Sequence, residues 1–199
     1  MRDKILTNAT ELFLNYGFKS VTMDDLANKI GISKKTIYQH FDNKTKLVEA
    51  TTLYIFDLIS QGIDCICALD KNPIEEIYQI KKFVMEHLKD EKSSPQYQLQ
   101  KYYPKIFETL KAKQFSVMKK CITNNLERGV AAGLYRETLN VNFISRIYFS
   151  SMLALKDKEL FHDKDFSMTM LMDNYLEYHL RGICTPKGLE ILTKHINKI

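Results

Sequence analysis

The fold of this chain is decided by residues 22–47, TMDDLANKIGISKKTIYQHFDNKTKL. Two helix starts are marked within this stretch. At the first, Thr22 is followed three residues later by Asp25, which is the spacing of a capping box. At the second, Ser33 precedes another run of helical spacing. Gly31 lies between them, where a left-handed residue ends a helix at no steric cost. The stretch therefore predicts two short helices joined by the turn Gly-Ile-Ser.

Apolar residues in the same stretch recur at helical spacing, which predicts a small shared core. These residues are Leu26, Ala27, Ile30, Ile37, Phe41 and Leu47. A preceding segment supplies one more apolar helix face, which Gly17 ends. Its members are Ile5, Leu6, Ala9, Leu12, Phe13 and Tyr16. We therefore expect three helices within the first 47 residues.

The outward side chains of the second short helix carry the groups that contact DNA. They offer cations, hydroxyls, an amide and an aromatic plane, which bind phosphates and the edges of bases. They are Lys34, Lys35, Thr36, Tyr38, Gln39 and His40. Across residues 33–46, four lysines and one aspartate carry a net charge of +3, out of a formal +5 for the whole chain. A run of lysines by itself is often only a solvated face, but this run coincides with both helix starts and the glycine turn. The stretch therefore indicates a helix-turn-helix that reads DNA.

These residues resemble the signature of the TetR family of bacterial transcriptional regulators. The likeness lies in residues 31–41, GISKKTIYQHF, followed by Asn43-Lys44 and by Leu47. In that family, a turn and a short recognition helix end in Tyr-x-His-Phe. The likeness extends more weakly to residues 128–136, RGVAAGLYR, which are similar to the loop after the family's seventh helix.

The resemblance implies a role for each matching residue. The residues expected to bind DNA phosphates are Thr22, Tyr38 and Lys44. The residues expected to approach base edges in the major groove are Lys34, Lys35, Thr36 and Gln39. His40 would touch the DNA backbone or brace the helix. Lys35 departs from the common pattern, because many members carry a small residue there, so an additional phosphate contact and an unusual operator preference are both open.

The remaining chain is long enough to form a second domain. No apolar run approaches the roughly 18 to 20 residues of a membrane span. Residues 1–15 carry charges where a signal peptide needs an apolar core. We therefore expect a cytoplasmic protein without a membrane partner. Residues 1–47 would form the helix-turn-helix DNA-binding domain, and residues 48–199 a helical effector-binding and dimerisation domain.

The pattern after residue 47 is helical, and the whole chain has only seven glycines and four prolines. Asn72, Pro73 and Glu75 supply a cap, a first-turn proline and a first-turn acid for one helix. A helix from about Asn43 to Gln61 would leave the DNA-binding domain and continue into the second domain. Together these signals predict an all-α fold with nine or ten helices.

The four cysteines do not form a disulfide framework in a chain of this size. Cys65 and Cys67 lack the second pair of Cys or His ligands that a structural zinc site requires. We interpret all four as reduced packing residues. No metal and no cofactor is expected.

Two segments of the last third carry apolar faces that either close the domain's own core or bind a second copy of the chain. The candidates for a dimer interface are Phe143, Ile147, Ser151, Leu171, Tyr175 and Tyr178. The family resemblance favours a dimer built from the family's eighth and ninth helices. A homodimer would bind a near-palindromic operator whose half-sites lie about 34 to 36 Å apart.

Aromatic and methionine side chains are numerous enough to line an apolar pocket. The candidates are Phe56, Tyr78, Phe83, Tyr103, Phe107, Met118, Tyr148 and Met152. The same side chains suit an ordinary helical interior, so both interpretations stay open. A small hydrophobic or amphipathic effector in such a pocket would favour a dimer whose DNA-binding domains are spaced wrongly for the operator, through a coupling of about 1 to 3 kcal/mol.

Two other classes of protein fit the sequence less well. It contains no Gly-rich phosphate loop, no His-Glu-x-x-His and no Gly-x-Ser-x-Gly motif, so an enzyme is not expected. A nonspecific architectural DNA-binding protein should spread its charge widely, whereas the net charge outside residues 33–46 is only +2. The leading hypothesis is a ligand-responsive transcriptional repressor that binds a palindromic operator as a dimer.

Overall fold

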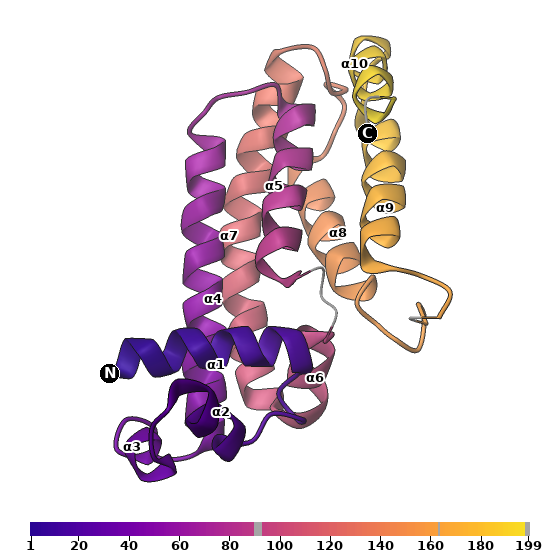
Figure 1. Cartoon of the computed structure of the whole chain (residues 1–199). Helices are drawn as coiled ribbons and strands as arrows, with labels where there is room; N and C mark the ends of the chain where they lie inside the picture. Colours follow the sequence, from indigo (N-terminus) through magenta and orange to yellow (C-terminus); the bar gives the residue numbers. More distant parts are fainter. Residues whose placement is uncertain (90–92, 163, 198–199) are drawn as a thin grey trace. The chain divides into compact units, whose positions relative to one another are not determined.

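A computed structural model describes residues 1–89, 93–162 and 164–197 of the chain. The described residues form ten α-helices and no strand, apart from one isolated bridge between Tyr135 and Cys184 (Figure 1). The all-α prediction is therefore confirmed. Among these residues, every helix falls short of the length or apolarity that crossing a membrane requires.

Close packing divides the chain into two compact units. The N-terminal unit contains Met1–Ser60 and Glu86–Gln114, and the C-terminal unit contains Gln61–Met85 and Phe115–Ile199. Each unit has its own apolar core.

Three helices contribute residues to both units. They are α4 (Lys44–Cys67), α5 (Pro73–His87) and α7 (Pro104–Ala131). The expected end of α4 near Gln61 is wrong, because the helix continues for six residues to Cys67. Ile63 lies in this extension and is buried, so packing favours the additional turns.

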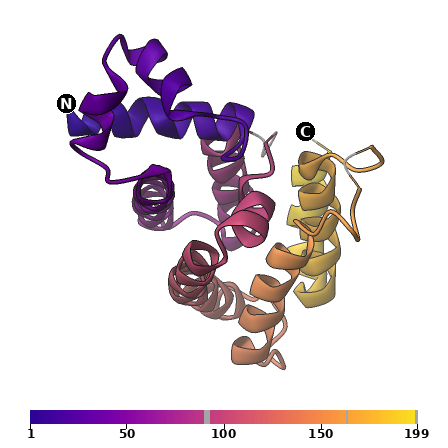
Figure 2. The same cartoon turned by 90° about the horizontal axis from the view of Figure 1, so that it is seen from below.

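The N-terminal unit is completed by four shorter helices. They are α1 (Arg2–Tyr16), α2 (Met23–Ile30), α3 (Lys34–Tyr38) and α6 (Pro95–Tyr102). Both Figure 1 and Figure 2 show α2 and α3 close to α1. Pro95 and Pro104 stand at the first positions of α6 and α7. Proline is tolerated there because the first helical N–H groups have no partner within the helix.

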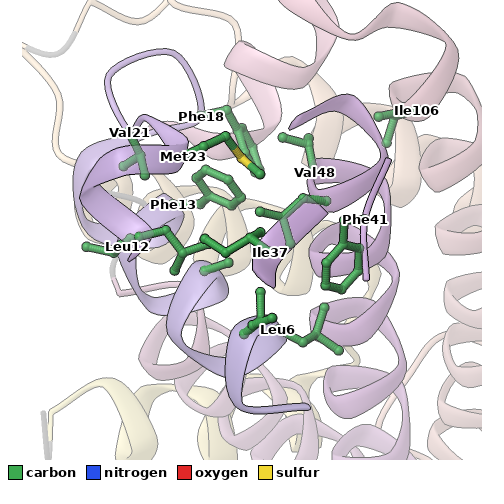
Figure 3. Packing of buried hydrophobic residues seen from close by; sticks show 14 of the residues in the cluster. Leu6, Leu12, Phe13, Phe18, Val21, Met23, Ile37, Phe41, Val48 and Ile106 are labelled. Atoms are coloured by element: carbon green, nitrogen blue, oxygen red, sulfur yellow. The ribbon is translucent and has the colours of Figure 1, made fainter. Parts of the chain in front are cut away.

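The core of the N-terminal unit brings together apolar side chains from α1, α2, α3, α4, α6 and α7. Figure 3 shows this cluster, in which Phe13 of α1 and Met23 of α2 point toward the same interior. Ile37 is the buried residue of α3 and is completely inaccessible. The apolar positions predicted for the helix-turn-helix are all buried, so the expected shared core is confirmed for Leu26, Ala27, Ile30, Ile37, Phe41 and Leu47.

The C-terminal unit contains three further helices in addition to its parts of α4, α5 and α7. They are α8 (Val141–Ala154), α9 (Met168–Ile183) and α10 (Pro186–Ile196). On α8, Tyr148 and Met152 are buried in the core, whereas Phe143 and Ile147 are exposed. The apolar positions of α8 are thus divided between the core and the surface.

A buried polar network lies in the C-terminal unit. The Glu76 side chain is fully buried, accepts a hydrogen bond from Asn125 Nδ2 at 2.8 Å and forms an ion pair with Arg128. Tyr135 donates to Asn125 Oδ1 at 3.2 Å, and Arg128 also pairs with Asp70 at 3.0 Å. Each buried polar group in this network therefore has a partner, as low-dielectric interiors require.

All four cysteines are free. Cys184 is buried, and Cys67 and Cys121 are half-buried with their sulfur atoms 3.4 Å apart. Cys65 is exposed, so its interpretation as a packing residue is wrong. It lies two residues before Cys67 on the same helix, and this spacing turns its side chain about 200° away from that of Cys67.

Candidate nucleic-acid interface

The start of α2 is fixed by a reciprocal cap. Thr22 Oγ1 accepts a hydrogen bond from the Asp25 N–H at 3.1 Å, and Asp25 Oδ2 accepts one from the Thr22 N–H at 2.8 Å. The predicted capping box is therefore confirmed. The hydrogen bond from the Thr22 N–H lowers the pKa of the Asp25 carboxyl, because it stabilises the charged form.

The turn between α2 and α3 depends on the conformation of Gly31. Its φ of 74° and ψ of 40° lie in the left-handed region, and its N–H donates to the Ala27 carbonyl at 3.0 Å. A Cβ atom at this position would meet no atom within 4 Å. Glycine is therefore favoured here by backbone conformation rather than by space. Ser33 then caps α3, accepting from the Thr36 N–H at 3.1 Å.

One face of the α3 segment is fixed in the core, and the opposite face is open to solvent. Ile37 is 0% exposed and Phe41 is 4% exposed, so both anchor the segment to the N-terminal unit. The Tyr38 side chain is 41% exposed. The other predicted DNA-contacting side chains of this segment are exposed, apart from half-buried Thr36, and they are Lys34, Lys35, Gln39 and His40. This arrangement presents a polar surface on a rigid support.

Two of the four lysines that make this segment basic are already paired with acids. Lys34 Nζ lies 2.8 Å from Asp24, and Lys46 Nζ lies 2.8 Å from Glu49. The hydrogen bond to Asp24 raises the pKa of Lys34, and the bond to Glu49 raises that of Lys46. Within the described part of the chain, Lys35 forms no such pair. The sequence did not show that Lys34 is paired while Lys35 is not, because Asp24 and Lys34 lie ten residues apart on different helices.

Lys44 lies close to the cap of α2. Its ammonium group donates to the Lys19 carbonyl at 3.5 Å, and the side chain is half-buried. Burial lowers the pKa of Lys44, while the nearby Asp25 carboxylate acts in the opposite direction. The structure thus brings Thr22 and Lys44, both predicted to bind phosphate, to the same carboxylate, Asp25.

His40 lines a hollow of about 510 Å³ that also includes the N-terminal end of α1. Arg2 lies there with its guanidinium 5.2 Å from the centre of the Phe41 ring. The hollow contains cations and carboxylates, including Asp42 and Glu49, so it has no strong preference for an anion. His40 and Arg2 therefore flank the α3 segment without forming a phosphate site of their own.

The predicted pocket residues are distributed over the two units. Phe56, Tyr103 and Phe107 belong to the N-terminal unit, while the C-terminal unit contains Tyr78, Phe83, Met118, Tyr148 and Met152. All eight are buried or half-buried. Burial, together with the charge of Asp173, raises the pKa of Tyr78 to about 12, and burial raises the pKa of Tyr103 and Tyr148 as well. Their hydroxyls are therefore neutral and able to donate hydrogen bonds at physiological pH.

The predicted dimer residues differ in exposure. Phe143, Ile147 and Tyr178 are 57%, 44% and 78% exposed. Leu171 is buried in the core of its own unit, and Tyr175 stacks on His179 with ring centres 5.6 Å apart. The large hydrophobic side chains exposed on α8 and α9 are therefore Phe143, Ile147, Tyr178 and Met170, which is 39% exposed.

The geometry agrees with comparisons against known proteins. Residues 5–51 match the model of the bacterial regulatory proteins of the tetR family. Over 79 residues the chain is 34% identical to the biofilm operon icaADBC HTH-type negative transcriptional regulator IcaR of Staphylococcus aureus. This alignment covers 40% of the chain and spans only 42% of the length of that relative.

Two solved structures share the fold over almost the whole chain. A transcriptional regulator from Cytophaga hutchinsonii has a TM-score of 0.71 at 18% identity, covering 92% of this chain and 98% of that one. A TetR-family regulator from Agrobacterium tumefaciens has a TM-score of 0.71 at 19% identity, covering 92% of this chain and 97% of that one. The matching proteins are named as regulators, which agrees with the expectation that the chain is not an enzyme. The helix-turn-helix segment, residues 5–51, therefore matches the tetR family of bacterial regulatory proteins, and the chain shares its helical fold with these solved regulators.

Proposed function

We propose that this protein is a ligand-responsive transcriptional repressor that binds a near-palindromic operator as a homodimer. The observation that carries the proposal is the exposed polar face of α3, held rigidly by the burial of Ile37 and Phe41. A short helix fixed in this way can enter the major groove, where base edges display a distinct pattern of donors and acceptors. Repression, rather than activation, is supported by the similarity to IcaR, which is named a negative regulator.

We assign different roles to the candidate DNA-contacting residues. Lys35, Thr36 and Gln39 approach base edges, because they lie in α3 or directly after it and none of them is buried. The phosphate contacts are assigned to Thr22, Tyr38 and Lys44, and His40 contacts the DNA backbone or braces α3. Lys34 reaches DNA only by exchanging its 2.8 Å ion pair with Asp24 for a contact to a base or phosphate. We therefore assign Lys35 the larger contribution to affinity.

DNA binding and effector binding are proposed to lie in successive parts of the chain. Residues 1–47 bind DNA, and residues 48–199 bind the effector and form the dimer. The exposed side chains Phe143, Ile147 and Tyr178 supply the apolar centre of the interface, with Ser151, Leu171 and Tyr175 beneath or beside them. Dimerisation is required by the mechanism, since one short helix reads too few bases for specific binding.

The effector is proposed to be a small hydrophobic or amphipathic molecule. The aromatic and methionine residues assigned to its pocket combine apolar surface with neutral tyrosine hydroxyls. Binding would favour the dimer geometry that fits the operator poorly, and α4 would carry the change because it contributes residues to both units. A regulator that binds chromosomal DNA acts in the bacterial cytoplasm, which we propose as its location.

Selection of bound duplexes from a random pool tests the proposal most directly. We expect one enriched motif with two inverted half-sites, whose centres lie about 34 to 36 Å apart. Binding to the selected duplex should survive an excess of random DNA. Equal affinity for selected and random duplexes would instead support a nonspecific DNA-coating protein and overturn the proposal.

A pair of variants separates base reading from phosphate binding. Gln39→Ala should weaken the selected duplex more than random DNA, by about 1 to 3 kcal/mol, if Gln39 contacts a base edge. Lys44→Ala should weaken both duplexes equally and reduce the salt dependence of binding. Identical behaviour of the two variants would contradict the assigned roles.

A further inference from the structure

We propose that Cys67 and Cys121 form a site of reversible oxidation, at which the two thiols join as a disulfide between α4 and α7. Cys67 is the last residue of α4, and Cys121 lies inside α7. Both residues belong to the C-terminal unit, so the inference does not depend on the proposed DNA-binding function. The co-reactant is a small-molecule disulfide of the glutathione type.

The two thiols meet in the fold although they lie 54 positions apart in the chain. Their sulfur atoms are 3.4 Å apart, so one thiol donates a hydrogen bond to the other. A disulfide has a sulfur–sulfur distance of about 2.0 Å, so the sulfur atoms need to approach by only about 1.4 Å. Cys67 ends its helix and is followed by a turn at residues 68–69, whereas Cys121 has helical turns on both sides. The approach is therefore expected to come from Cys67, since helix ends fray.

Exposure and direction distinguish this pair from the other two cysteines. Cys67 and Cys121 are half-buried, so a small reagent can reach them, whereas Cys184 is buried. Cys65 is exposed, but its side chain is turned about 200° away from that of Cys67. All four cysteines lie in the described part of the chain, and Cys67 and Cys121 are the two whose sulfur atoms are in contact.

The surroundings of the two thiols assign the first attack to Cys67. Burial raises the pKa of both thiols, and the carboxylates of Glu76 and Asp64 act in the same direction. At Cys67 this rise is opposed by the hydrogen bond with Cys121 and by the charge of Arg128. At Cys121 the neighbouring Cys67 raises the pKa further. Cys67 therefore loses its proton more readily, because the Cys121 thiol can donate to the resulting thiolate.

The oxidation consists of two thiol–disulfide exchanges. The Cys67 thiolate attacks one sulfur of oxidised glutathione, which forms a mixed disulfide and releases one glutathione thiolate that takes up the proton lost by Cys67. Cys121 then loses its proton and attacks the Cys67 sulfur. This step forms the Cys67–Cys121 bond and releases the second glutathione, which takes up the proton of Cys121. The two protein thiols are thus oxidised by two electrons, and one glutathione disulfide is reduced to two thiols.

The raised pKa values affect the rate and the equilibrium of this reaction differently. A small fraction of thiolate slows the attack on the small-molecule disulfide. The reduced form, however, gains no stability from a favoured thiolate, so the equilibrium is not shifted towards the two thiols. We therefore expect slow oxidation to a persistent disulfide. Because the bond closes a long loop, it should raise the melting temperature by about 4 to 16 °C.

The test incubates the folded, full-length protein with oxidised glutathione and then alkylates the remaining thiols. Mass spectrometry of peptides prepared without reductant identifies each cysteine as linked, glutathionylated or alkylated. We expect a Cys67–Cys121 link in the wild type and in Cys65→Ser, the matched control, which removes the nearby exposed thiol on the same helix. Cys121→Ser should stop at a mixed disulfide between Cys67 and glutathione. Cys67→Ser should leave Cys121 largely alkylated.

The wild type and Cys65→Ser decide whether the site exists, since both keep the two thiols. A Cys67–Cys121 link that raises the melting temperature and is removed by dithiothreitol without denaturant supports the site. If Cys67 and Cys121 are both alkylated after prolonged incubation, the site is excluded, even where Cys65 carries glutathione or joins two chains. If Cys67→Ser accumulates glutathione on Cys121 faster than Cys121→Ser does on Cys67, the assigned order of attack is wrong. Circular dichroism melting curves of the reduced variants check that each of them is folded.

Discussion

The N-terminal and C-terminal units are stabilised by different kinds of core. The N-terminal core is almost entirely apolar. Its buried hydroxyls of Thr10 and Thr51 donate to carbonyls within their own helices, and the buried Thr52 hydroxyl has no partner among the described residues. The C-terminal core encloses Glu76, whose partners Asn125 and Arg128 lie about fifty residues away in the chain. One unit therefore depends on volume and local capping, while the other also depends on a polar network between distant segments.

This difference has consequences for what each unit tolerates. An apolar core loses stability in proportion to the volume removed, and it accepts residues of similar size. A buried ion pair is different, because removing one partner leaves the other desolvated and unpaired. Substitutions in each unit should therefore differ in how much stability they cost.

The largest effect is expected for Arg128→Met. Glu76 is completely buried, so the loss of its cationic partner should lower the free energy of unfolding by about 3 to 5 kcal/mol. Urea denaturation followed by circular dichroism measures this change. Arg181→Met is the matched control, because Arg181 pairs with Glu177 at 2.7 Å on an exposed part of α9, where such a pair contributes about 0.5 kcal/mol or less. If Arg128→Met and Arg181→Met lost equal stability, the buried ion pair would contribute no more than the exposed one, and the proposed difference between the cores would be wrong.

A second prediction concerns the pH dependence of the C-terminal unit. Burial of His179 lowers its pKa from 6.5 to about 4, so the folded protein holds it neutral while the unfolded chain takes up a proton below pH 6.5. Stability should therefore fall as the pH is lowered from 6.5 to 4, by up to about 3 kcal/mol. Denaturation curves of the wild type and His179→Phe across this range measure the effect. If His179→Phe lost as much stability as the wild type over this pH range, other titrating groups would be the cause.

The next largest loss of stability is expected at Gly17 in the N-terminal unit, because of its backbone conformation. Gly17 has φ 84° and ψ 158°, a region that is almost exclusive to glycine. Gly17→Ala should lower the free energy of unfolding by about 1 to 3 kcal/mol and displace Gln98 from its contact with Lys19. Gly31→Ala is the comparison, with an expected cost of about 1 to 2 kcal/mol from the left-handed conformation alone. Thermal denaturation of both variants should show the larger loss for Gly17→Ala, and the reverse order would contradict the role given to Gln98.

The smallest effect is expected at the cap of α2. Thr22→Ala removes the acceptor for the first turn and should cost about 1 kcal/mol. Thr45→Ala changes an exposed threonine near the start of α4 and should stay within about 0.5 kcal/mol of the wild type. Operator binding by Thr22→Ala should weaken as well, since we assign its hydroxyl a phosphate contact. If Thr45→Ala lost as much stability as Thr22→Ala, the loss in Thr22→Ala could not be attributed to the missing cap.

The two units also differ in how much of them could be predicted. The cap at Thr22, the turn at Gly31 and the cap at Ser33 involve residues at most four positions apart, so the sequence predicted each of them correctly. The Glu76 network was not predicted, because no local spacing relates Glu76 to Asn125 or Arg128. Likewise, helical spacing showed that α8 carries apolar residues, but it did not distinguish buried Tyr148 from exposed Ile147.

The candidate interface shows the same limit at the level of single charges. The sequence located the basic segment and its exposed helix correctly, since both follow from local composition and spacing. Only the tertiary structure showed that Lys34 pairs with Asp24, and that Lys19 and Lys101 both lie over the ring of Tyr102. The sequence by itself therefore determined the helix-turn-helix, because helix caps and turns act over a few residues. Tertiary packing decided which cations remain available and which polar groups are buried, because those outcomes depend on segments that meet only when the chain folds.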